Sequence, residues 1–394
     1  MKRLELPTRI PILNWASQIE DSCITQAVNL ANLPFAINHI ALMPDAHPGY
    51  GMPIGGVLFA DKAVIPYAVG VDIGCGVSLT TTTLTVHDLE GKLQQLLDSI
   101  AARIPVGNGP GAQHDHEVNA FDWSQIAPVD PTVRSLSTVL GNSINAAKGQ
   151  LGTLGGGNHF IEVQADTAGR VNVMLHSGSR SVGHKVCTYW HKIALGLNRR
   201  WHSALTDDEL AYLPWDTDEA RGYFADMTAV LSWAEQNRWW MRFHVEQAIS
   251  DLFPGTVFRL VADIHHNYAA WENHGGRNGI VHRKGAVRAR KDEVVLIPGS
   301  MGTASYVGMG AGSPTSFETC QHGAGRARSR KATERLQTEE QFAAQMTGIL
   351  LGGNAANARD ESPFAYKDVE QVMADSVDLV QPTTRLRPLG VVKG

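Results

Sequence analysis

Short apolar runs bounded by turns alternate along the chain with longer amphipathic stretches. The short runs are rich in β-branched residues and predict strands at residues 37–43, 57–59, 63–69, 78–86, 160–164, 171–175, 257–264 and 293–297. Apolar residues at helical spacing predict amphipathic helices over residues 89–104 and about 219–252, and a partly helical segment over 133–151. Strands lead repeatedly into glycine loops, and no linker or internal repeat interrupts them. We therefore expect one compact α+β domain over residues 1–394, with central β-sheets flanked by helices and an active site on glycine-rich loops at strand ends.

The remaining segments carry weaker patterns. Residues 44–51 are expected on a loop after the strand at 37–43, and residues 105–130 are expected to form a surface excursion. The tail at 384–394 is short, basic and of mixed polarity. No run of about 18 apolar residues occurs, so the sequence predicts no membrane span. The first residues carry charge without an apolar core, so no signal peptide is expected.

Composition adds two constraints. The four cysteines form no CxxC pair, which favours a reducing, cytoplasmic location. The net charge of −5 argues against broad nonspecific affinity for nucleic acid but leaves room for a local basic groove. Sixteen histidines and thirty-nine glycines are the unusual counts, and together they suggest histidine ligands on glycine loops.

Residues 70–76, Gly-Val-Asp-Ile-Gly-Cys-Gly, organise the candidate chemistry. Asp72 and Cys75 project from a glycine-rich turn, where the backbone can take positive φ and approach a ligand closely. A thiolate selects soft or borderline cations, and a neighbouring carboxylate keeps manganese within reach. Taken alone, a tight turn with a buried cysteine is the simpler interpretation. The metal interpretation needs histidine partners elsewhere in the chain.

Three histidines supply such partners. His159, His176 and His266 each stand beside a glycine- or asparagine-containing turn and are expected just after a strand. With Asp72 and Cys75 they make five ligand-type side chains that can meet at one end of a sheet. Such a set permits one divalent ion, or two that share the Cys75 thiolate. Each histidine alone is typical of a hydrogen-bonded loop residue, but the set predicts a metal site.

His322 belongs to a different kind of loop. Gly-Ala-Gly follows it, and Arg326 and Arg330 come next, a combination that suits phosphate binding. A neutral imidazole beside a bound phosphate can act as nucleophile or as general acid. The chain has no P-loop and no well-placed dinucleotide fingerprint, so the loop at 299–305 and Lys284 become candidate phosphate contacts. The alternative for Lys284 is an exposed charged turn.

Taken together, these segments resemble the RtcB family of RNA ligases over nearly the whole chain. Ten segments occur in family order. They are Met-Pro-Asp-Ala-His at 43–47, the turn at 70–76, 155–162, 176–180, His-Asn at 266–267, 282–286, 298–306, 322–330, Ala-Tyr-Lys-Asp at 365–368 and 385–394. The segment after Arg180 (181–184), the loop 105–130 and the segment 201–222 do not match the family pattern. These departures concern the choice of substrate more than the chemistry.

The resemblance implies an activity. The family joins RNA 3′-phosphate or 2′,3′-cyclic phosphate ends to 5′-hydroxyl ends with GTP and manganese. His322 would attack the α-phosphorus of GTP and carry GMP, which passes to the RNA 3′-phosphate before the 5′-hydroxyl displaces it. Partners would be RNA with such ends and an archease-type activator protein.

The resemblance also implies residue roles. The ligands of two manganese ions would be Asp72, Cys75, His159, His176 and His266, with Cys75 bridging. The nucleotide would be held by Asn158, Glu162, Gly299, Ser300, Met301, Ser305, Ala324, Gly325 and Lys393. The cations around the RNA phosphate would be Arg180, Lys284, Arg326 and Arg330.

Three other functions compete. The first is an enzyme that guanylylates 3′-phosphates or opens cyclic phosphates without efficient sealing. The second is a noncatalytic RNA-end or ribosome-associated binding module, which would be expected to lack the nucleophile or a ligand. The third is a generic metallohydrolase, which leaves the His322 loop and Lys393 unexplained.

Overall fold

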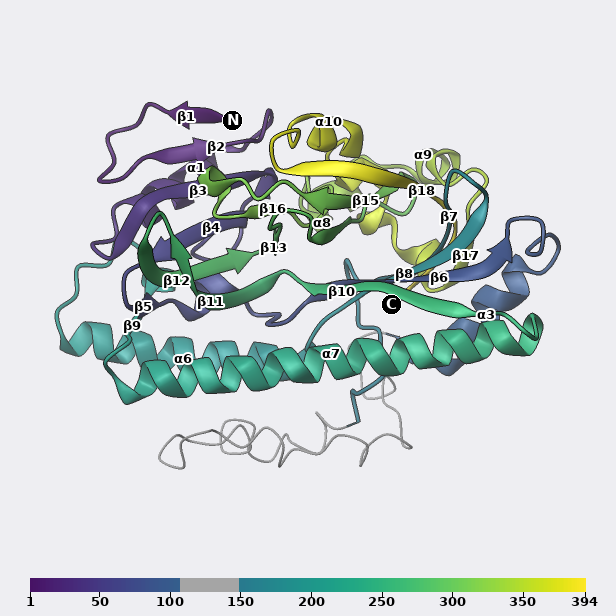
Figure 1. Cartoon of the computed structure of the whole chain (residues 1–394), viewed down its shortest axis with the longest axis horizontal. Helices are drawn as coiled ribbons and strands as arrows, with labels where there is room; N and C mark the ends of the chain where they lie inside the picture. The colour runs from purple at the N-terminus through teal and green to yellow at the C-terminus, as the bar shows by residue number, and fades with distance from the viewer. Residues whose placement is uncertain (107–148) are drawn as a thin grey trace.

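The computed structural model describes residues 1–106 and 149–394. Within these residues the protein contains two large β-sheets, two small two-stranded sheets and eight α-helices (Figure 1). The expected α+β class is confirmed. The loop expected at 105–130 and the helical segment expected at 133–151 lie almost entirely outside the described residues.

The first large sheet has six strands in the order β1-β2-β3-β4-β12-β11. Their bounds are Lys2–Leu4 (β1), Ile12–Asn14 (β2), Ala36–His47 (β3), Ile54–Ala60 (β4), Arg277–Lys284 (β12) and Asn267–His274 (β11). The start of β4 pairs with the last residues of both neighbours: Ile54 lies opposite His47, and Gly56 lies opposite Lys284. The ends of β3 and β12 therefore reach the same edge of this sheet.

The second large sheet has eight strands in the order β10-β6-β8-β7-β18-β15-β14, with β17 beside β18. Their bounds are Phe258–His265 (β10), Gly76–Thr85 (β6), Arg170–Ser177 (β8), Phe160–Ala165 (β7), Val380–Lys393 (β18), Ser305–Gly310 (β15), Val294–Ile297 (β14) and Leu350–Gly353 (β17). All these pairs are antiparallel except β17 with β18. The small sheets pair β5 (Ala63–Val64) with β9 (Leu213–Pro214) and β13 (Ala286–Arg288) with β16 (Thr319–Gln321).

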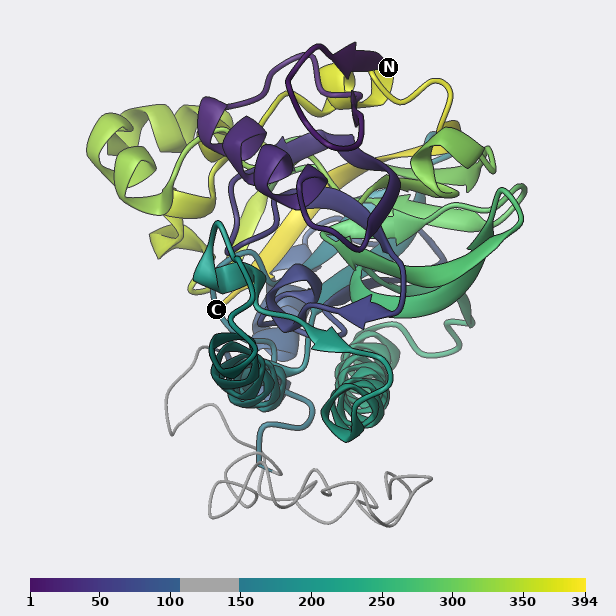
Figure 2. The same ribbon diagram turned by 90° about the vertical axis from the view of Figure 1, so that its left-hand side faces the viewer.

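The helices cover the sheets from outside. Their bounds are Asp21–Ala31 (α1), Pro66–Val69 (α2), Leu93–Arg103 (α3), Arg180–Arg200 (α6), Asp218–Leu252 (α7), Arg330–Leu336 (α8), Glu339–Gln345 (α9) and Val369–Ala374 (α10). The two longest, α6 and α7, lie side by side along one side of the molecule (Figures 1 and 2). Leu97 of α3 and Val245 of α7 join Val163 of β7 in one buried cluster, so these helices close one face of the eight-stranded sheet.

Most of the predicted elements are confirmed with small shifts in their bounds. The strand predicted at 37–43 is longer, because β3 continues through His47 and places Asp45 within the strand and not on a loop. Residues 63–69 are only partly a strand: β5 ends at Val64, and Pro66 begins the short helix α2, where its fixed φ suits a first helical turn. The tail at 384–394 was assigned no regular structure from the sequence, but it belongs to strand β18 in the middle of the eight-stranded sheet.

Helix α6 is the largest element without a sequence prediction. Its apolar residues are interrupted by histidine, glycine and lysine, so the helical period is diluted. The structure shows the period on its buried side, at Val182, Val186, Trp190 and Ala194. Among the described residues, no helix combines the length and apolar character needed to span a bilayer.

Candidate active site

Four neighbouring antiparallel strands bring the predicted ligands to one end of the eight-stranded sheet. Gly76, the first residue of β6, pairs with Ser177 at the end of β8 and with His265 at the end of β10. Phe160, the first residue of β7, pairs with His176. Because antiparallel neighbours start where the others end, the residues just outside these strands meet. His159 stands just before β7 and His176 lies inside β8, so only His266 follows a strand as expected.

The turn at residues 70–76 is shaped for its two ligands. Gly74 has φ of +74°, a conformation that side chains rarely adopt. Asp72 accepts hydrogen bonds on Oδ1 from the backbone N–H of Ser179 at 3.0 Å and from its hydroxyl at 3.1 Å. A Cβ on Gly178 would lie 2.3 Å from that same oxygen, so the close approach requires glycine there. The start of α6 is thereby tied to the Asp72 carboxylate.

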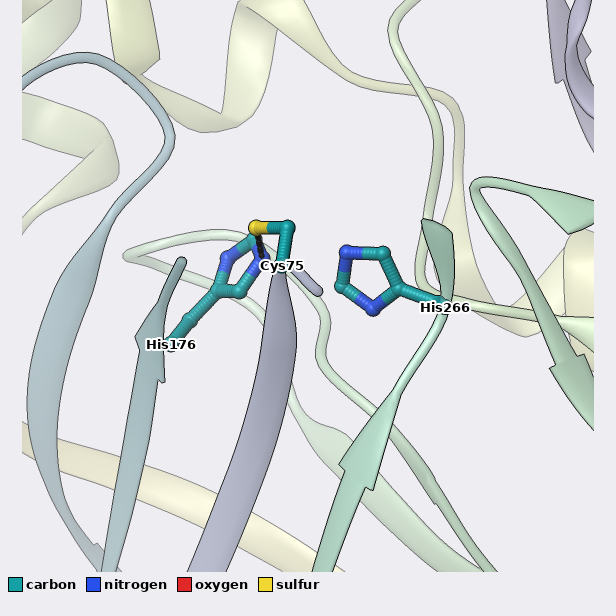
Figure 3. Close-up of side chains that lie close together, drawn as sticks. All are labelled: Cys75, His176 and His266. Atoms are coloured by element: carbon teal, nitrogen blue, oxygen red, sulfur yellow. Dashed lines mark hydrogen bonds between the residues drawn. The ribbon is translucent and has the colours of Figure 1, made fainter. Parts of the chain in front are cut away.

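The ligand atoms converge in two groups that share one sulfur. Cys75 Sγ lies 3.2 Å from His176 Nε2 and 3.4 Å from His159 Nε2. His159 Nε2 is also 3.1 Å from Asp72 Oδ2. One group is Cys75, His176 and His266, and the other is Asp72, Cys75 and His159; in each group the ligand atoms lie within 4.8 Å of one another. Figure 3 shows His176 and His266 on opposite sides of Cys75.

The chemistry of these donors fits divalent ions. His159 Nδ1 and His176 Nδ1 donate to the carbonyl oxygens of Leu154 and Asn158 at 3.0 and 3.1 Å, which leaves each Nε2 free to bind a metal. His266 Nδ1 is buried and has no hydrogen-bond partner among the described residues. A buried polar atom without a partner is costly unless a ligand satisfies it. The five predicted ligands therefore form a candidate site for two ions with Cys75 common to both.

Burial sets the protonation states around this site. It lowers the pKa of His176 and His266 well below the usual value, which keeps both imidazoles neutral and able to coordinate. Burial and then the Asp72 charge raise the pKa of Cys75 well above its usual value. A coordinated cation reverses that effect, because a thiol bound to a metal is deprotonated. For Asp72, burial acts to raise the pKa, but the hydrogen bond and charge of His159 lower it to about 2.

His322 follows β16 of a two-stranded sheet and is oriented by a carboxylate from β3 of the six-stranded sheet. Its Nδ1–H donates to Asp45 Oδ2 at 2.6 Å, and its backbone N–H donates to the same oxygen at 3.1 Å. Asp45 is fully buried, and Lys367 Nζ donates to the carbonyl oxygen of the next residue, Ala46, at 2.7 Å. The hydrogen bond from Nδ1 to Asp45 holds the His322 imidazole in the tautomer whose Nε2 is unprotonated. The ring centre of His322 is 4.8 Å from that of His266, so this nitrogen is close to the candidate metal site.

Asp45 received no role from the sequence. Its motif at 43–47 was recognised, but a loop was expected there, and nothing in the sequence linked it to a histidine 277 positions away. A single acidic residue inside an otherwise apolar run was the available signal, because an unpaired carboxylate is rarely buried.

One cavity of about 700 Å³ joins these elements. It is lined by His322, by the candidate ligands Asp72, Cys75, His176 and His266, and by all the predicted nucleotide residues: Asn158, Glu162, Gly299, Ser300, Met301, Ser305, Ala324, Gly325 and Lys393. Lys284, Arg326 and Arg330 also line it. His159 reaches the site through its contacts with Cys75 and Asp72, and Arg180 donates from Nε to Thr153 Oγ1 at 3.1 Å beside it.

A buried glutamate that the sequence did not reveal holds two of the predicted RNA-phosphate cations, Arg326 and Arg330, and the predicted nucleotide residue Lys393. Glu361 is 1% exposed; it accepts from Arg326 Nη1 at 3.0 Å and forms an ion pair with Arg330, whose Nη2 lies 2.9 Å away. Lys393 Nζ lies 3.8 Å from its other oxygen, which also accepts from the Tyr366 hydroxyl. Burial acts to raise the pKa of Glu361, but the charges of Lys393, Arg326 and Arg330 lower it below its usual value. The carboxylate therefore stays charged and fixes these side chains at the cavity.

Lys284 has unexpected partners. Its Nζ donates to the carbonyl oxygens of Tyr50 at 2.5 Å, Met52 at 3.0 Å and Tyr67 at 3.0 Å. All three of its donors are thus used by the backbone, and burial lowers its pKa to about 8. In this geometry the side chain connects the loop after β3 with helix α2.

We expect Lys284→Met to lower the free energy of unfolding by about 3 kcal/mol, because three carbonyl groups lose a buried donor. Urea unfolding measures this loss, and Lys291→Met, at an exposed lysine between β13 and β14, is the matched control. Unchanged stability together with weaker RNA binding would instead assign Lys284 to RNA phosphate.

Comparison with known proteins agrees with the geometry. The family profile described as tRNA-splicing ligase RtcB matches residues 26–394. The RNA-splicing ligase RtcB of Escherichia coli K12 is 37% identical over 98% of this chain and 97% of its own length. The tRNA-splicing ligase RtcB of Nanoarchaeum equitans is 32% identical over 95% and 92%, and the RNA-splicing ligase RtcB of Mycobacterium bovis is 34% identical over 94% and 100%. The chain therefore belongs to the RtcB family of tRNA-splicing ligases.

Proposed function

We propose that this protein is a GTP- and manganese-dependent RNA ligase that joins 3′-phosphate or 2′,3′-cyclic phosphate ends to 5′-hydroxyl ends. The observation that carries the proposal is the cavity in which the oriented imidazole of His322 stands beside the candidate two-ion site. We take residues 1–394 as one ligase domain, since both large sheets contribute to that cavity.

The metal ligands proposed are Asp72, Cys75 and His159 for one ion, and Cys75, His176 and His266 for the other. Two neighbouring divalent ions neutralise phosphate charge and stabilise both the attacking and the leaving oxygens of an in-line displacement. The protein supplies neutral imidazoles, a shared thiolate and hydrogen bonds that fix the donor atoms.

The residues of the cavity suit a nucleotidyl transfer through His322. Its Nε2 lone pair attacks the α-phosphorus of GTP, a P–N bond forms, and pyrophosphate leaves with the electrons of the broken P–O bond. Asp45 accepts the Nδ1–H and stabilises the positive charge that develops on the imidazole. An oxygen of the RNA 3′-phosphate then attacks the phosphorus of this GMP, and the P–N bond to His322 breaks; a cyclic phosphate end is first opened by water to give the 3′-phosphate. The 5′-hydroxyl oxygen finally attacks that 3′-phosphorus, its proton passes to solvent, and GMP leaves with the electrons of the broken P–O bond.

We assign the guanine base to the wall formed by β7 and the end of β18. Glu162 lies two residues after Phe160 in β7, and Phe160 pairs with Lys393 of the neighbouring strand β18. The side chains of Glu162 and Lys393 are both buried. A carboxylate accepts from the N1–H and amino group of guanine, and an ammonium group donates to its O6. Adenine offers neither pattern, so these two residues would favour GTP over ATP.

Guanine binding should depend on pH through Glu162. Burial raises its pKa to about 8, against the hydrogen bond from Gln164, so below pH 8 the carboxyl group holds a proton that it must lose to accept from guanine. We expect the affinity for guanosine, which has no phosphate, to rise about tenfold per pH unit from pH 6 toward 8 and then to level off. Titration calorimetry measures this dependence. Glu162→Gln, which has no such proton, should bind weakly with a flat profile; a flat wild-type profile would contradict the assignment.

The proposed function is tested by incubating the protein with GTP, Mn²⁺ and two RNAs, one with a 3′-phosphate and one with a 5′-hydroxyl. We expect a joined product that requires GTP and is absent with ATP. A 3′-hydroxyl and 5′-phosphate pair, the ends that other ligases use, is the control and should stay unjoined. Guanylylated 3′-ends without sealing would favour the end-modifying enzyme, and RNA binding without any reaction would favour the binding module.

A further inference from the structure

One part of the cavity lining has no role in the proposed chemistry. The lining includes His47, Pro48, Gly49, Tyr50 and Ile54. None of the residues assigned to GTP comes from this segment. Tyr50 is 61% exposed, although large aromatic side chains are usually mostly buried. An exposed ring at the rim of a reactive cavity points to a ligand that covers it.

The backbone that carries this ring is fixed. Gly49 N–H donates to Gln26 Oε1 at 3.1 Å, and Gly51 N–H donates to Glu209 Oε2 at 2.5 Å. Lys284 Nζ donates to the carbonyl oxygens of both Tyr50 and Tyr67 and so joins the two tyrosine-bearing segments. A ligand that binds here does not have to order the backbone, which is a property of a preorganised binding surface.

The aromatic surface continues from Tyr50 toward helix α6. The ring centres of Tyr50 and Tyr67 are 6.2 Å apart at an interplanar angle of 45°. Tyr67 in turn stacks on His191 of α6, with ring centres 3.8 Å apart and planes within 8°. Successive aromatic faces beside a basic track are the arrangement that single-stranded nucleic acid uses for base stacking.

Helix α6 supplies the charge that such a strand needs. Its 21 residues include Arg180, Lys185, Lys192, Arg199 and Arg200 and no acidic residue, in a chain whose net charge is −5. Three acidic residues carry charges that act on His191 or Tyr67, and one of them, Asp208, is paired with a cation of the helix. Asp208 pairs with Arg199 at 2.7 Å, Glu209 accepts from Gly51, and Asp207 accepts from the backbone N–H of Glu209. The helix begins at the Asp72 site, so its positive charge leads to the reactive centre.

We propose that Tyr50, with Tyr67 beside it, stacks a nucleobase of the single-stranded RNA end that enters the cavity, while the phosphates of that strand follow the basic residues of α6. This subsite rests on the proposed RNA ligase function and specifies how the substrate is held. It recognises any base, because every base offers an aromatic face, and it discriminates RNA ends by strandedness.

The test is a double-mutant cycle on RNA binding. Dissociation constants are measured with Mn²⁺ present for short single-stranded RNAs with a 5′-hydroxyl or a 3′-phosphate end, each with an intact or an abasic terminal nucleotide. We expect Tyr50→Ala to weaken binding of the intact RNA with one of the two ends, the 5′-hydroxyl or the 3′-phosphate, by about 5- to 150-fold. This is the range expected for the loss of one base–aromatic stack. The abasic RNA should bind wild type and Tyr50→Ala equally. Tyr50→Phe, which keeps the ring, should bind the intact RNA more tightly than the abasic RNA, as the wild-type protein does.

Trp239→Ala, at an exposed aromatic residue of α7 outside the cavity lining, is the control and should change neither affinity. If Tyr50→Ala weakens intact and abasic RNA by the same factor for both ends, or if neither RNA binds, the subsite is overturned. Ligation by the wild-type protein is measured separately. Joined RNA without base-dependent coupling would refute the subsite alone, and coupling without joined RNA would refute the ligase function alone.

Discussion

His322→Ala should form no covalent adduct with GTP and should join RNA ends at least about 10⁴-fold more slowly than the wild-type protein, because the group that takes up GMP is gone. His322 donates from Nδ1 to a carboxylate, which leaves its Nε2 available for attack. Among the described residues, no other histidine that lines the cavity has this arrangement. The measurement is a gel assay of label from α-labelled GTP together with a ligation time course.

The bound metal separates this role from a ligand role. His322 belongs to neither group of converging ligand atoms, so the manganese content of His322→Ala should stay near the wild-type value. His87→Ala, at an exposed histidine that pairs with Glu90, is the control for loss of an imidazole. An adduct that persists in His322→Ala, or metal lost along with activity, would refute the nucleophile assignment.

Cys75→Ala should lose both manganese and ligation. The Sγ of Cys75 is the one atom common to both candidate ion sites in the part of the chain that the structure describes, and a methyl group cannot replace a thiolate ligand. Loss of two-ion stabilisation worth several kcal/mol corresponds to a rate at least about 10³-fold lower. Metal analysis of the purified protein and the ligation assay measure the two effects.

The chain offers a matched control in Cys23→Ala, since Cys23 is equally buried but packs in the cluster beneath α1. This variant should keep its metal and its activity. Retained manganese-dependent ligation in Cys75→Ala would mean that the sulfur does not bridge two ions.

The sequence indicated which ligand-type side chains lie together better than it indicated the elements that position them. Glycine turns and histidines beside strands pointed to Asp72, Cys75, His176 and His266, because a turn is a local feature. That His159 precedes its strand, and that it meets Cys75, depends on the antiparallel pairing of β7 with β8, which spans distant segments. Long-range pairing also decided β18, whose mixed polarity at 384–394 gave no local indication of a central strand.

The contacts that orient the site were the least predictable part. Asp45 and Glu361 act on His322, Arg326 and Arg330 only because the fold buries each carboxylate beside its partners. Lys284 is a further example, since a cation expected at RNA phosphate donates in this structure to three backbone carbonyls, which its residue type did not indicate. A side chain's residue type indicates what it can bind, but burial and neighbouring groups determine which of its possible partners it meets.

The central claim is most directly tested by a chase of the labelled protein. The wild-type protein is labelled with α-labelled GTP and Mn²⁺, freed of nucleotide, and mixed with RNA that has a 3′-phosphate, with and without RNA that has a 5′-hydroxyl. We predict that the label moves from an acid-labile bond on the protein to the RNA 3′-end, and leaves as GMP when the 5′-hydroxyl RNA is joined. Label that stays on the protein, or joined RNA whose formation precedes any transfer of label, would contradict a ligase that works through His322.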